Sequence, residues 1–478
     1  MRKPLILSVV LAAAALAQAP QGQQQSLAGV VRLNRAPVSN EVLKVNLPLP
    51  VERQLSNGMK LLVVESHRVP TITLRMTLPS GDLRDPAGLP GVSDATAALI
   101  RLGTKTRSAK DIAETVAELG ASLAIGSSQG EATVFLSSLT ENFDAALAVL
   151  ADVLLNPTFP QDELDKWKAR QRATLEQAKA QPGFLGNDQM MKVLYPNDGR
   201  RYTHPTLEAL NKITRENILE HYQKYYLPSG EWAGVAGDIS PKDAVAKLDK
   251  VLGVWKGGPV AHVTMPFPEP IGSRKVYLIP RPNSVQTFLM ATNHAIDRKS
   301  PDYIEVQVMN RILGSGPSSR LFRIIREEKG YTYGVGSGFS ATRYLNHFTA
   351  STSVRTEVTE PALAELLKQF GDIRDRAVPD DELADAKSAI VAGFVLGLES
   401  PDSVLSRWME QRQDGLPEDY WDVYPQKVNA VTADAVERVA KKYVPLDNVQ
   451  IIAVGDATKI GDLLKKFGTV EEVSPDMN

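Results

Sequence analysis

The sequence predicts an α+β protein made of two homologous domains. Three observations support this fold class. Helix-period and strand-period stretches are mixed, with strands adjacent in the chain. A pattern in residues 214–238 returns at 432–456. One stretch rich in glycine and proline, residues 257–272, lies between the two patterned halves.

The repeat is the strongest of the three observations, because similarity at a fixed offset indicates a duplicated unit whatever fold that unit has. Residues 214–238 and 432–456 align without a gap at an offset of 218 residues (432 − 214), and each runs from a helix pattern into a strand pattern. A second segment, residues 160–164, matches 379–383 at an offset of 219 (379 − 160). Two separate segments at nearly one offset predict a duplicated domain.

The repeat and the composition shifts divide the chain into five regions. The expected regions are a signal peptide at 1–17, an N-terminal arm at 18–50, a first domain at 51–256, a linker at 257–272 and a second domain at 273–478.

The first half alternates strands with helices. Residues 59–65 and 71–78 alternate as strands, and we expect residues 66–70 to join them as a hairpin. Residues 108–120 form a helix with Ser108 as N-cap and Gly120 at its end. Further strands are expected at 121–127, 132–139 and 232–236, and further helices at 92–102, 142–155, 162–180 and 214–226.

The N-terminus is typical of a bacterial secretory signal. Arg2 and Lys3 precede an apolar run at 5–16, and Ala15-Leu16-Ala17 places small residues at the cleavage positions. A cut after Ala19 and an uncleaved membrane anchor are the alternatives. We therefore expect a periplasmic or secreted protein. No other stretch approaches the length of a membrane span, so no stable membrane insertion is expected.

Composition excludes several classes of function. The chain has no cysteine, which excludes disulfides, thiolate metal sites and a cysteine nucleophile. Its 54 basic and 56 acidic residues give a net charge of −2, which does not favour nucleic acid as a partner. The six histidines are scattered, and no pair has the helical spacing that binds zinc.

The stretch Ser318–Val335 suggests a pair of hydrogen-bond donors. Leu321, Ile324 and Ile325 form an apolar stripe, so residues 318–329 are expected to be helical up to Gly330. The residues that follow alternate as a strand. Arg326 then lies in the last helical turn and Tyr333 on the strand, where both side chains could reach a carbonyl or an oxyanion. The alternatives are a solvated cation at a helix end and an ordinary half-buried strand tyrosine.

The chain resembles the pitrilysin/insulinase family of metallopeptidases, M16, in the branch related to mitochondrial processing peptidase. The matching pieces cover most of the chain: Ser56-Asn57-Gly58, Gly91-Val92-Ser93, Gly103-Thr104, Leu119-Gly120-Ala121, Leu154-Leu155-Asn156-Pro157, and Ser319-Arg320-Leu321-Phe322 with Arg326-Glu327 and Gly330. The resemblance implies two homologous α+β domains that form half of a clamshell.

The chain departs from the family at the zinc site. Active members carry His-x-x-Glu-His after the Gly-Val-Ser position, with a further glutamate downstream. Here those positions hold Asp94, Ala97 and Ala98, and Gln177 with Glu176 beside it. Alanines can act neither as ligand nor as base, so we expect this chain to bind no metal and no other cofactor.

The resemblance assigns roles to the remaining candidates. The family carries an Arg and a Tyr seven positions apart, as in Arg326 and Tyr333, which contact the substrate carbonyl. The resemblance therefore implies a non-zinc-binding subunit of a heterodimeric zinc metallopeptidase, whose partner carries His-x-x-Glu-His and the zinc, and which cleaves unfolded peptides. It also implies that the strand at 121–127 pairs with substrate through Ala121, Ser122, Leu123 and Ala124.

Three alternatives stay open at this point. The small residues at 121–124 could simply pack against a helix. The chain could be an inactive scaffold or binding protein that keeps the fold. A peptidase with a rearranged metal site built on Asp94 and Glu176 is the third.

Overall fold

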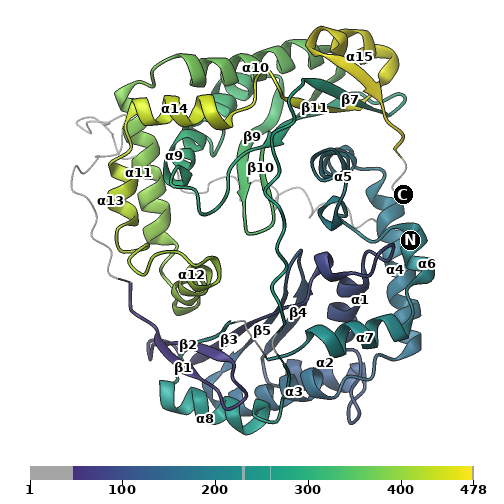
Figure 1. The fold of residues 1–478 in the computed structure, drawn as a ribbon, viewed down its shortest axis with the longest axis vertical. Helices are drawn as coiled ribbons and strands as arrows, with labels where there is room; N and C mark the ends of the chain where they lie inside the picture. Colours follow the sequence, from purple (N-terminus) through teal and green to yellow (C-terminus); the bar gives the residue numbers. More distant parts are fainter. Residues whose placement is uncertain (1–46, 229–231, 259, 476–478) are drawn as a thin grey trace, which may run out of the picture. The chain divides into compact units, whose positions relative to one another are not determined.

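The structure is a computed structural model that describes residues 47–228, 232–258 and 260–475. Two six-stranded mixed sheets form its framework (Figure 1). The first has the order β1-β2-β6-β3-β5-β4 and the second β12-β7-β11-β8-β10-β9. The strands are β1 (Val51–Gln54), β2 (Lys60–Glu65), β3 (Thr71–Leu78), β4 (Ser122–Ser127), β5 (Ala132–Leu139), β6 (Trp232–Gly237), β7 (Lys275–Pro280), β8 (Gln286–His294), β9 (Thr332–Ala341), β10 (Asn346–Arg355), β11 (Gln450–Gly455) and β12 (Thr469–Glu472).

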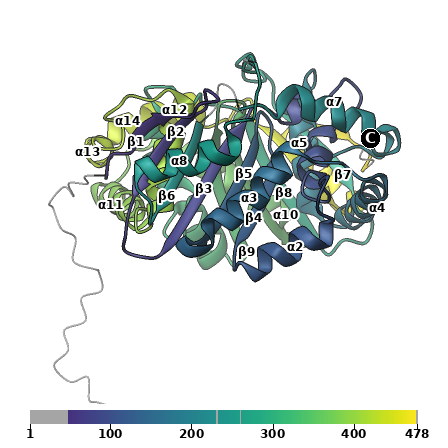
Figure 2. The same ribbon diagram turned by 90° about the horizontal axis from the view of Figure 1, so that it is seen from below.

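Helices accompany both sheets, which confirms the predicted α+β class. In the first half they are α1 (Val92–Leu99), α2 (Ala109–Glu118), α3 (Phe143–Leu155), α4 (Gln161–Ala178), α5 (Pro182–Leu194), α6 (Leu207–Lys212), α7 (Arg215–Tyr225) and α8 (Pro241–Leu252). In the second half they are α9 (Tyr303–Leu313), a π-helix (Phe322–Glu328), α10 (Thr359–Asp375), α11 (Asp380–Leu396), α12 (Pro401–Asp414), α13 (Tyr424–Asn429), α14 (Ala433–Tyr443) and α15 (Ala457–Leu464). Figure 2 shows α3 and α8 lying across the strands of the first sheet.

The repeat corresponds to matching elements. Helices α7 and α14 both follow a threonine N-cap, Thr214 or Thr432, whose side chain accepts a backbone N–H of the first turn. Each leads into a strand that has the same place in its sheet. Strand β6 lies between β2 and β3, and β11 lies between β7 and β8. Helices α4 and α11 both follow a proline, Pro160 or Pro379. The predicted duplication is confirmed.

The predicted hairpin at residues 66–70 is wrong. Strand β6 lies between β2 and β3, parallel to the first and antiparallel to the second. The short-range pairing instead joins β1 to β2, where Leu55 N–H donates to the Met59 carbonyl. Gly237 ends β6 with φ of +125°, and a Cβ there would lie 2.0 Å from the Thr71 carbonyl oxygen. A glycine is required there.

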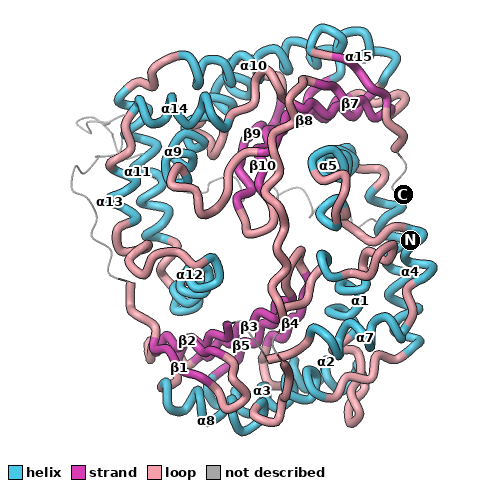
Figure 3. Tube along the Cα trace, in the orientation of Figure 1, coloured by secondary structure: helices cyan, strands magenta, loops and turns pink. Residues whose placement is uncertain are grey.

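Each half sends one helix onto the sheet of the other half. Helix α5 packs on β8 and β11, and α12 packs on β2 and β6. Figure 3 shows both helices beside the strands that they cover. The contacts are close, since a Cβ on Gly186 of α5 would lie 2.4 Å from the Phe288 ring and one on Gly234 of β6 would lie 2.7 Å from Leu405 of α12.

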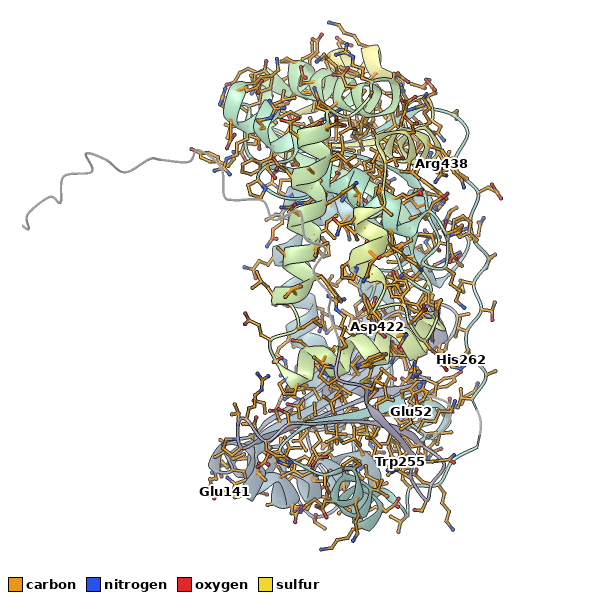
Figure 4. The ribbon with its side chains drawn as sticks, turned by 90° about the vertical axis from the view of Figure 1, so that its left-hand side faces the viewer. Glu52, Glu141, Trp255, His262, Asp422 and Arg438 are labelled. Atoms are coloured by element: carbon orange, nitrogen blue, oxygen red, sulfur yellow. The ribbon has the colours of Figure 1, made fainter. Side chains whose placement is uncertain are left out.

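The described residues of 257–272 contain no helix or strand. Figure 4 labels His262, which is a residue of this segment. Arg84 donates to the Ala261 carbonyl at 2.6 Å, and Arg200 donates to the Pro266 carbonyl at 3.2 Å. Both contacts come from residues of the first half, so the segment is held to that half at two points, while the predicted domain boundaries remain predictions.

The predicted signal peptide and most of the predicted arm lie outside the described residues. At the end of the arm, Leu47 is buried and the Pro48 carbonyl accepts a hydrogen bond from the indole of Trp408 at 2.9 Å. In the described ranges, no single helix has both the length and the apolar content to cross a membrane. Among the described helices, only the bent pair α11 and α12 together passes that test, with 112° between its members.

Candidate functional site

Arg326 lies in an unusual turn of helix. The predicted helix does end at Gly330, whose φ is +62°, but residues 322–328 form a π-helix rather than an α-helix. The Lys329 N–H donates to the Ile324 carbonyl at 3.0 Å, which gives the wider turn. Of the predicted apolar stripe, Leu321 and Ile325 are fully buried, whereas Ile324 is half-buried.

Tyr333 lies on β9, one of the two edge strands of the second sheet, next to the π-helix. Its side chain is 92% exposed, so the alternative of a half-buried strand tyrosine is wrong. Arg326 is exposed as well, and its guanidinium carbon lies 4.5 Å from the centre of the Phe322 ring. Within the described ranges, neither the guanidinium nor the phenol has a hydrogen-bond or ion-pair partner. Two strong donors are therefore available on adjoining elements.

The positions that carry zinc ligands in active family members do not fit zinc here. Asp94, Ala97 and Ala98 lie on α1, and Ala97 is 2% exposed. Helix α1 contacts α4, where Gln177 is exposed and Glu176 pairs with Lys179 at 2.7 Å. Across the described part of the chain, no group of three or more His, Cys, Asp or Glu is placed to hold a metal ion. The structure therefore gives no support to a rearranged site built on Asp94 and Glu176.

Asp94 belongs instead to a cluster of three carboxyl groups. Burial, together with the nearby charges of Asp82 and Asp85, raises the pKa of Asp94 to about 7. Burial also raises the pKa of Asp85 to about 7, although its carboxylate accepts the N–H groups of Gly91 and Ser93 at 2.6 and 2.7 Å. The three groups line a cavity of about 350 Å³ that also has His204 in its wall.

This carboxyl cluster was not predicted from the sequence. Its only local sign is the pair of aspartates three residues apart before α1, which is common in loops. Asp82 accepts the hydroxyls of Ser93 and Ser127 at 2.8 and 3.1 Å, so the cluster also joins β4 to α1.

The predicted substrate strand forms the edge of the first sheet. Within the described residues, β4 pairs only with β5, so its other side has no strand neighbour. Ser122 and Ala124 are exposed, Ala121 is half-buried and Leu123 is buried at 8% exposure. The strand also contacts α1 and α2, so its small residues pack near helices as well as forming an open edge. Its pairing with substrate stays a prediction.

Two histidines that are far apart in the sequence are neighbours in the fold. His294 of β8 pairs with His347 of β10, and the ring of Tyr195 lies within 5.2 and 6.1 Å of their rings. The Tyr195 hydroxyl lies 3.1 Å from His347 Nδ1. Burial lowers the pKa of His347 to about 4. Their separation of 53 residues (347 − 294) gave no local sign of this pair.

Comparisons with known proteins identify the family. The profile described as "Insulinase (Peptidase family M16)" matches residues 60–201, and the one described as "Peptidase M16 inactive domain" matches residues 212–390. The first range holds the degenerate zinc positions, and the second holds Arg326 and Tyr333.

Individual relatives agree with the profiles. A Bacillus subtilis protein described as "Uncharacterized zinc protease YmxG" is 24% identical over 355 residues, covering 73% of this chain and 85% of the relative. A Helicobacter pylori protein described as "Non-peptidase homolog YmxG" is 21% identical over 409 residues, covering 84% of this chain and 94% of the relative.

A solved structure shares the fold. The crystal structure of a peptidase M16 inactive domain from Pseudomonas fluorescens has a TM-score of 0.79 and 28% identity to this chain. The match covers 85% of this chain and 98% of that one. The two profiles, the shared fold and the lost ligand positions agree, and the chain belongs to peptidase family M16 as a member of the non-catalytic type.

Proposed function

We propose that this chain is the non-zinc subunit of a heterodimeric M16 peptidase. Its partner would be an M16 subunit with His-x-x-Glu-His, which supplies the zinc and the general base. This chain would supply Arg326 and Tyr333 in trans, to bind the carbonyl of an unfolded peptide and to stabilise the oxyanion that forms on cleavage. We also propose that the complex works in the periplasm or outside the cell.

One observation carries the proposal. Arg326 and Tyr333 are exposed on adjoining elements with their polar groups unpaired by the described residues, in a chain whose own zinc positions hold Asp94, Ala97 and Ala98. Arginine side chains are mostly exposed, but a tyrosine is usually at least partly buried, so the 92% exposure of Tyr333 beside Arg326 is the unusual feature. Donors left free in this way suit a ligand from outside the chain.

The chemistry expected of the pair is donation of hydrogen bonds. As the scissile carbonyl becomes tetrahedral, its oxygen gains negative charge, and fixed N–H and O–H donors stabilise that charge more than they stabilise the ground state. Removal of one such donor costs about 10²–10³ in kcat in other enzymes. An extended substrate could add to the open edge of β4 through backbone hydrogen bonds.

The second candidate is an inactive scaffold with the M16 fold. The description of the Helicobacter pylori relative as a "Non-peptidase homolog" favours it. Under this reading, Arg326 and Tyr333 would have no effect on the turnover of any partner, so the two candidates differ in a measurable outcome.

The test is a co-expression experiment. The chain is produced with a candidate M16 zinc subunit from the same organism, and the cleavage of an unstructured fluorogenic peptide is followed. The Arg326→Ala/Tyr333→Phe double variant is expected to lower kcat by at least about a hundredfold, with the complex intact on a sizing column. Undiminished kcat in an intact complex would establish the scaffold reading instead.

A matched control lies in the same segment. Arg323 is exposed on the same π-helix, where it pairs with Glu328 at 2.8 Å, and Tyr331 is half-buried two residues before Tyr333. The Arg323→Ala/Tyr331→Phe variant should keep kcat within about twofold, because surface ion pairs contribute little. An equal loss in both double variants would mean that the segment acts through its folding and would contradict the proposal.

A further inference from the structure

The segment that carries Arg326 holds its three arginines in two different ways. Arg320 donates to both carboxylate oxygens of Glu382, the shortest contact being 2.6 Å, and Arg323 pairs with Glu328 at 2.8 Å. Arg326 instead lies over the Phe322 ring at 4.5 Å. A carboxylate pairs with each of the first two arginines, whereas an aromatic face restrains a guanidinium and leaves its five N–H donors free.

The π-helix holds Phe322 and Arg326 four residues apart, a spacing at which side chains on a helix are neighbours. In its wide turn, the side chains at positions 322 and 326 lie on one exposed side, while the adjacent pair Leu321 and Ile325 is fully buried in the core. A π-helix of seven residues is rare, and such turns are found frequently at functional sites. Phe322 is only half-buried, so packing of the core does not account for its ring.

We infer that Phe322 is a positioning residue for Arg326, an inference that rests on the proposed function. The ring fixes the direction of the guanidinium before the substrate arrives, so its donors need not be ordered in the transition state. Phe322 itself touches no substrate. Its effect should therefore pass entirely through Arg326.

Substitutions that separate ring chemistry from bulk test the inference. In the complex with the zinc subunit, Phe322→Leu keeps apolar bulk without the aromatic face, and Phe322→Trp keeps the face. We expect Phe322→Leu to lower kcat about fivefold with little change in KM, and Phe322→Trp to stay within about twofold of the natural chain. Phe322→Ala should behave like Phe322→Leu.

The decisive measurement is a double-mutant cycle. In an Arg326→Ala background, Phe322→Ala should cause no further loss of kcat, because the residue it positions is gone. A further fivefold loss there, or full activity in Phe322→Leu, would overturn the inference. If Arg326→Ala alone leaves kcat unchanged, it is the proposed function that fails, so the two failures are distinguishable.

A matched aromatic elsewhere controls for general effects. The Arg75 guanidinium lies 4.9 Å from the Phe135 ring, but both ends of that guanidinium already bind Asp402. Phe135→Ala should therefore leave kcat unchanged in the complex. If Phe135→Ala lowered kcat as much as Phe322→Ala does, stacking of an arginine on a ring would matter only for the fold. That result would overturn the positioning role of Phe322.

Discussion

Arg75 of β3 binds Asp402 of α12 through two parallel hydrogen bonds, Nε to Oδ1 at 2.6 Å and Nη2 to Oδ2 at 2.7 Å. The pair joins the sheet of the first half to a helix of the second half. Asp402 also lies in the first turn of α12, where a negative charge is favoured by the helix dipole.

We expect this pair to contribute to the free energy of unfolding because its geometry is bidentate. A double-mutant cycle with Arg75→Ala and Asp402→Ala should give a coupling energy of about 1 kcal/mol by urea denaturation. The exposed pair Lys110–Glu114, at 3.6 Å on α2, should give a coupling near zero in the same assay. Equal couplings would mean that the contact between the halves gains nothing from this ion pair.

Gly186 should be sensitive to the smallest substitution. A Cβ there would lie 2.4 Å from the Phe288 ring, so Gly186→Ala should lower the free energy of unfolding by about 1–3 kcal/mol through overpacking. At Gly183, in the same helix, the corresponding distance is 3.7 Å, an ordinary contact. Gly183→Ala should therefore be neutral or slightly stabilising. Equal shifts in the melting temperatures of the two variants would contradict this prediction.

The His347 imidazole should make the fold less stable in acid. Its pKa is about 4 in the fold, against 6.5 for an ordinary histidine, so the unfolded chain binds more protons between these values. The free energy of unfolding should fall by up to about 3 kcal/mol as pH drops from 7 to 4. His347→Gln, which keeps a hydrogen-bonding side chain, should remove much of that fall in urea titrations.

His67 provides a control of opposite sign. Hydrogen bonds to Asp238 and Glu65 raise its pKa, so its contribution is present at low pH and is lost as pH rises through the raised pKa. His67→Gln should therefore make the chain more sensitive to acid, not less. Identical pH profiles for the two histidine variants would contradict both assignments.

Asp94 should destabilise the fold at alkaline pH. Its pKa is about 7 in the fold and 3.8 for an ordinary aspartate, so stability is lost as pH rises from 4 through 7. Asp94→Asn should exceed the natural chain in free energy of unfolding by roughly 2 kcal/mol or more at pH 8, and by little at pH 4. If Asp94→Asn and the natural chain had the same free energy of unfolding at both pH values, the burial of a charged Asp94 would be contradicted.

Local patterns predicted most of the fold. Helices α7 and α14 carry threonine caps, and β6 and β11 carry continuous apolar runs, so the repeat could be read directly. The hairpin expected at residues 66–70 failed because β6, which is more than 160 residues downstream of β2, takes the place beside it. When a strand from a distant segment inserts between two consecutive strands, the sequence of the loop that joins those two strands does not indicate it.

The candidate site was predictable from the sequence only in part. Alanine has no group that can bind a metal, so the sequence alone was sufficient to predict that Ala97 and Ala98 are not zinc ligands. The position of Tyr333 on a strand was also predicted, but its 92% exposure was not, because exposure depends on its being at the edge of the sheet. The π-helix was missed because the stripe Leu321 and Ile325 fits an α-helix equally well.

The exchange of α5 and α12 has a consequence for how the chain is made. On the ribosome the first sheet can assemble once β6 has emerged, but α12, which covers its inner face, ends only at Asp414. At a synthesis rate of ~5–20 residues per second, the apolar face of β2 and β6 stays uncovered for roughly 10–35 s. Over that interval the nascent first half is exposed to aggregation, and a holding chaperone would be most useful between synthesis of residues 237 and 414.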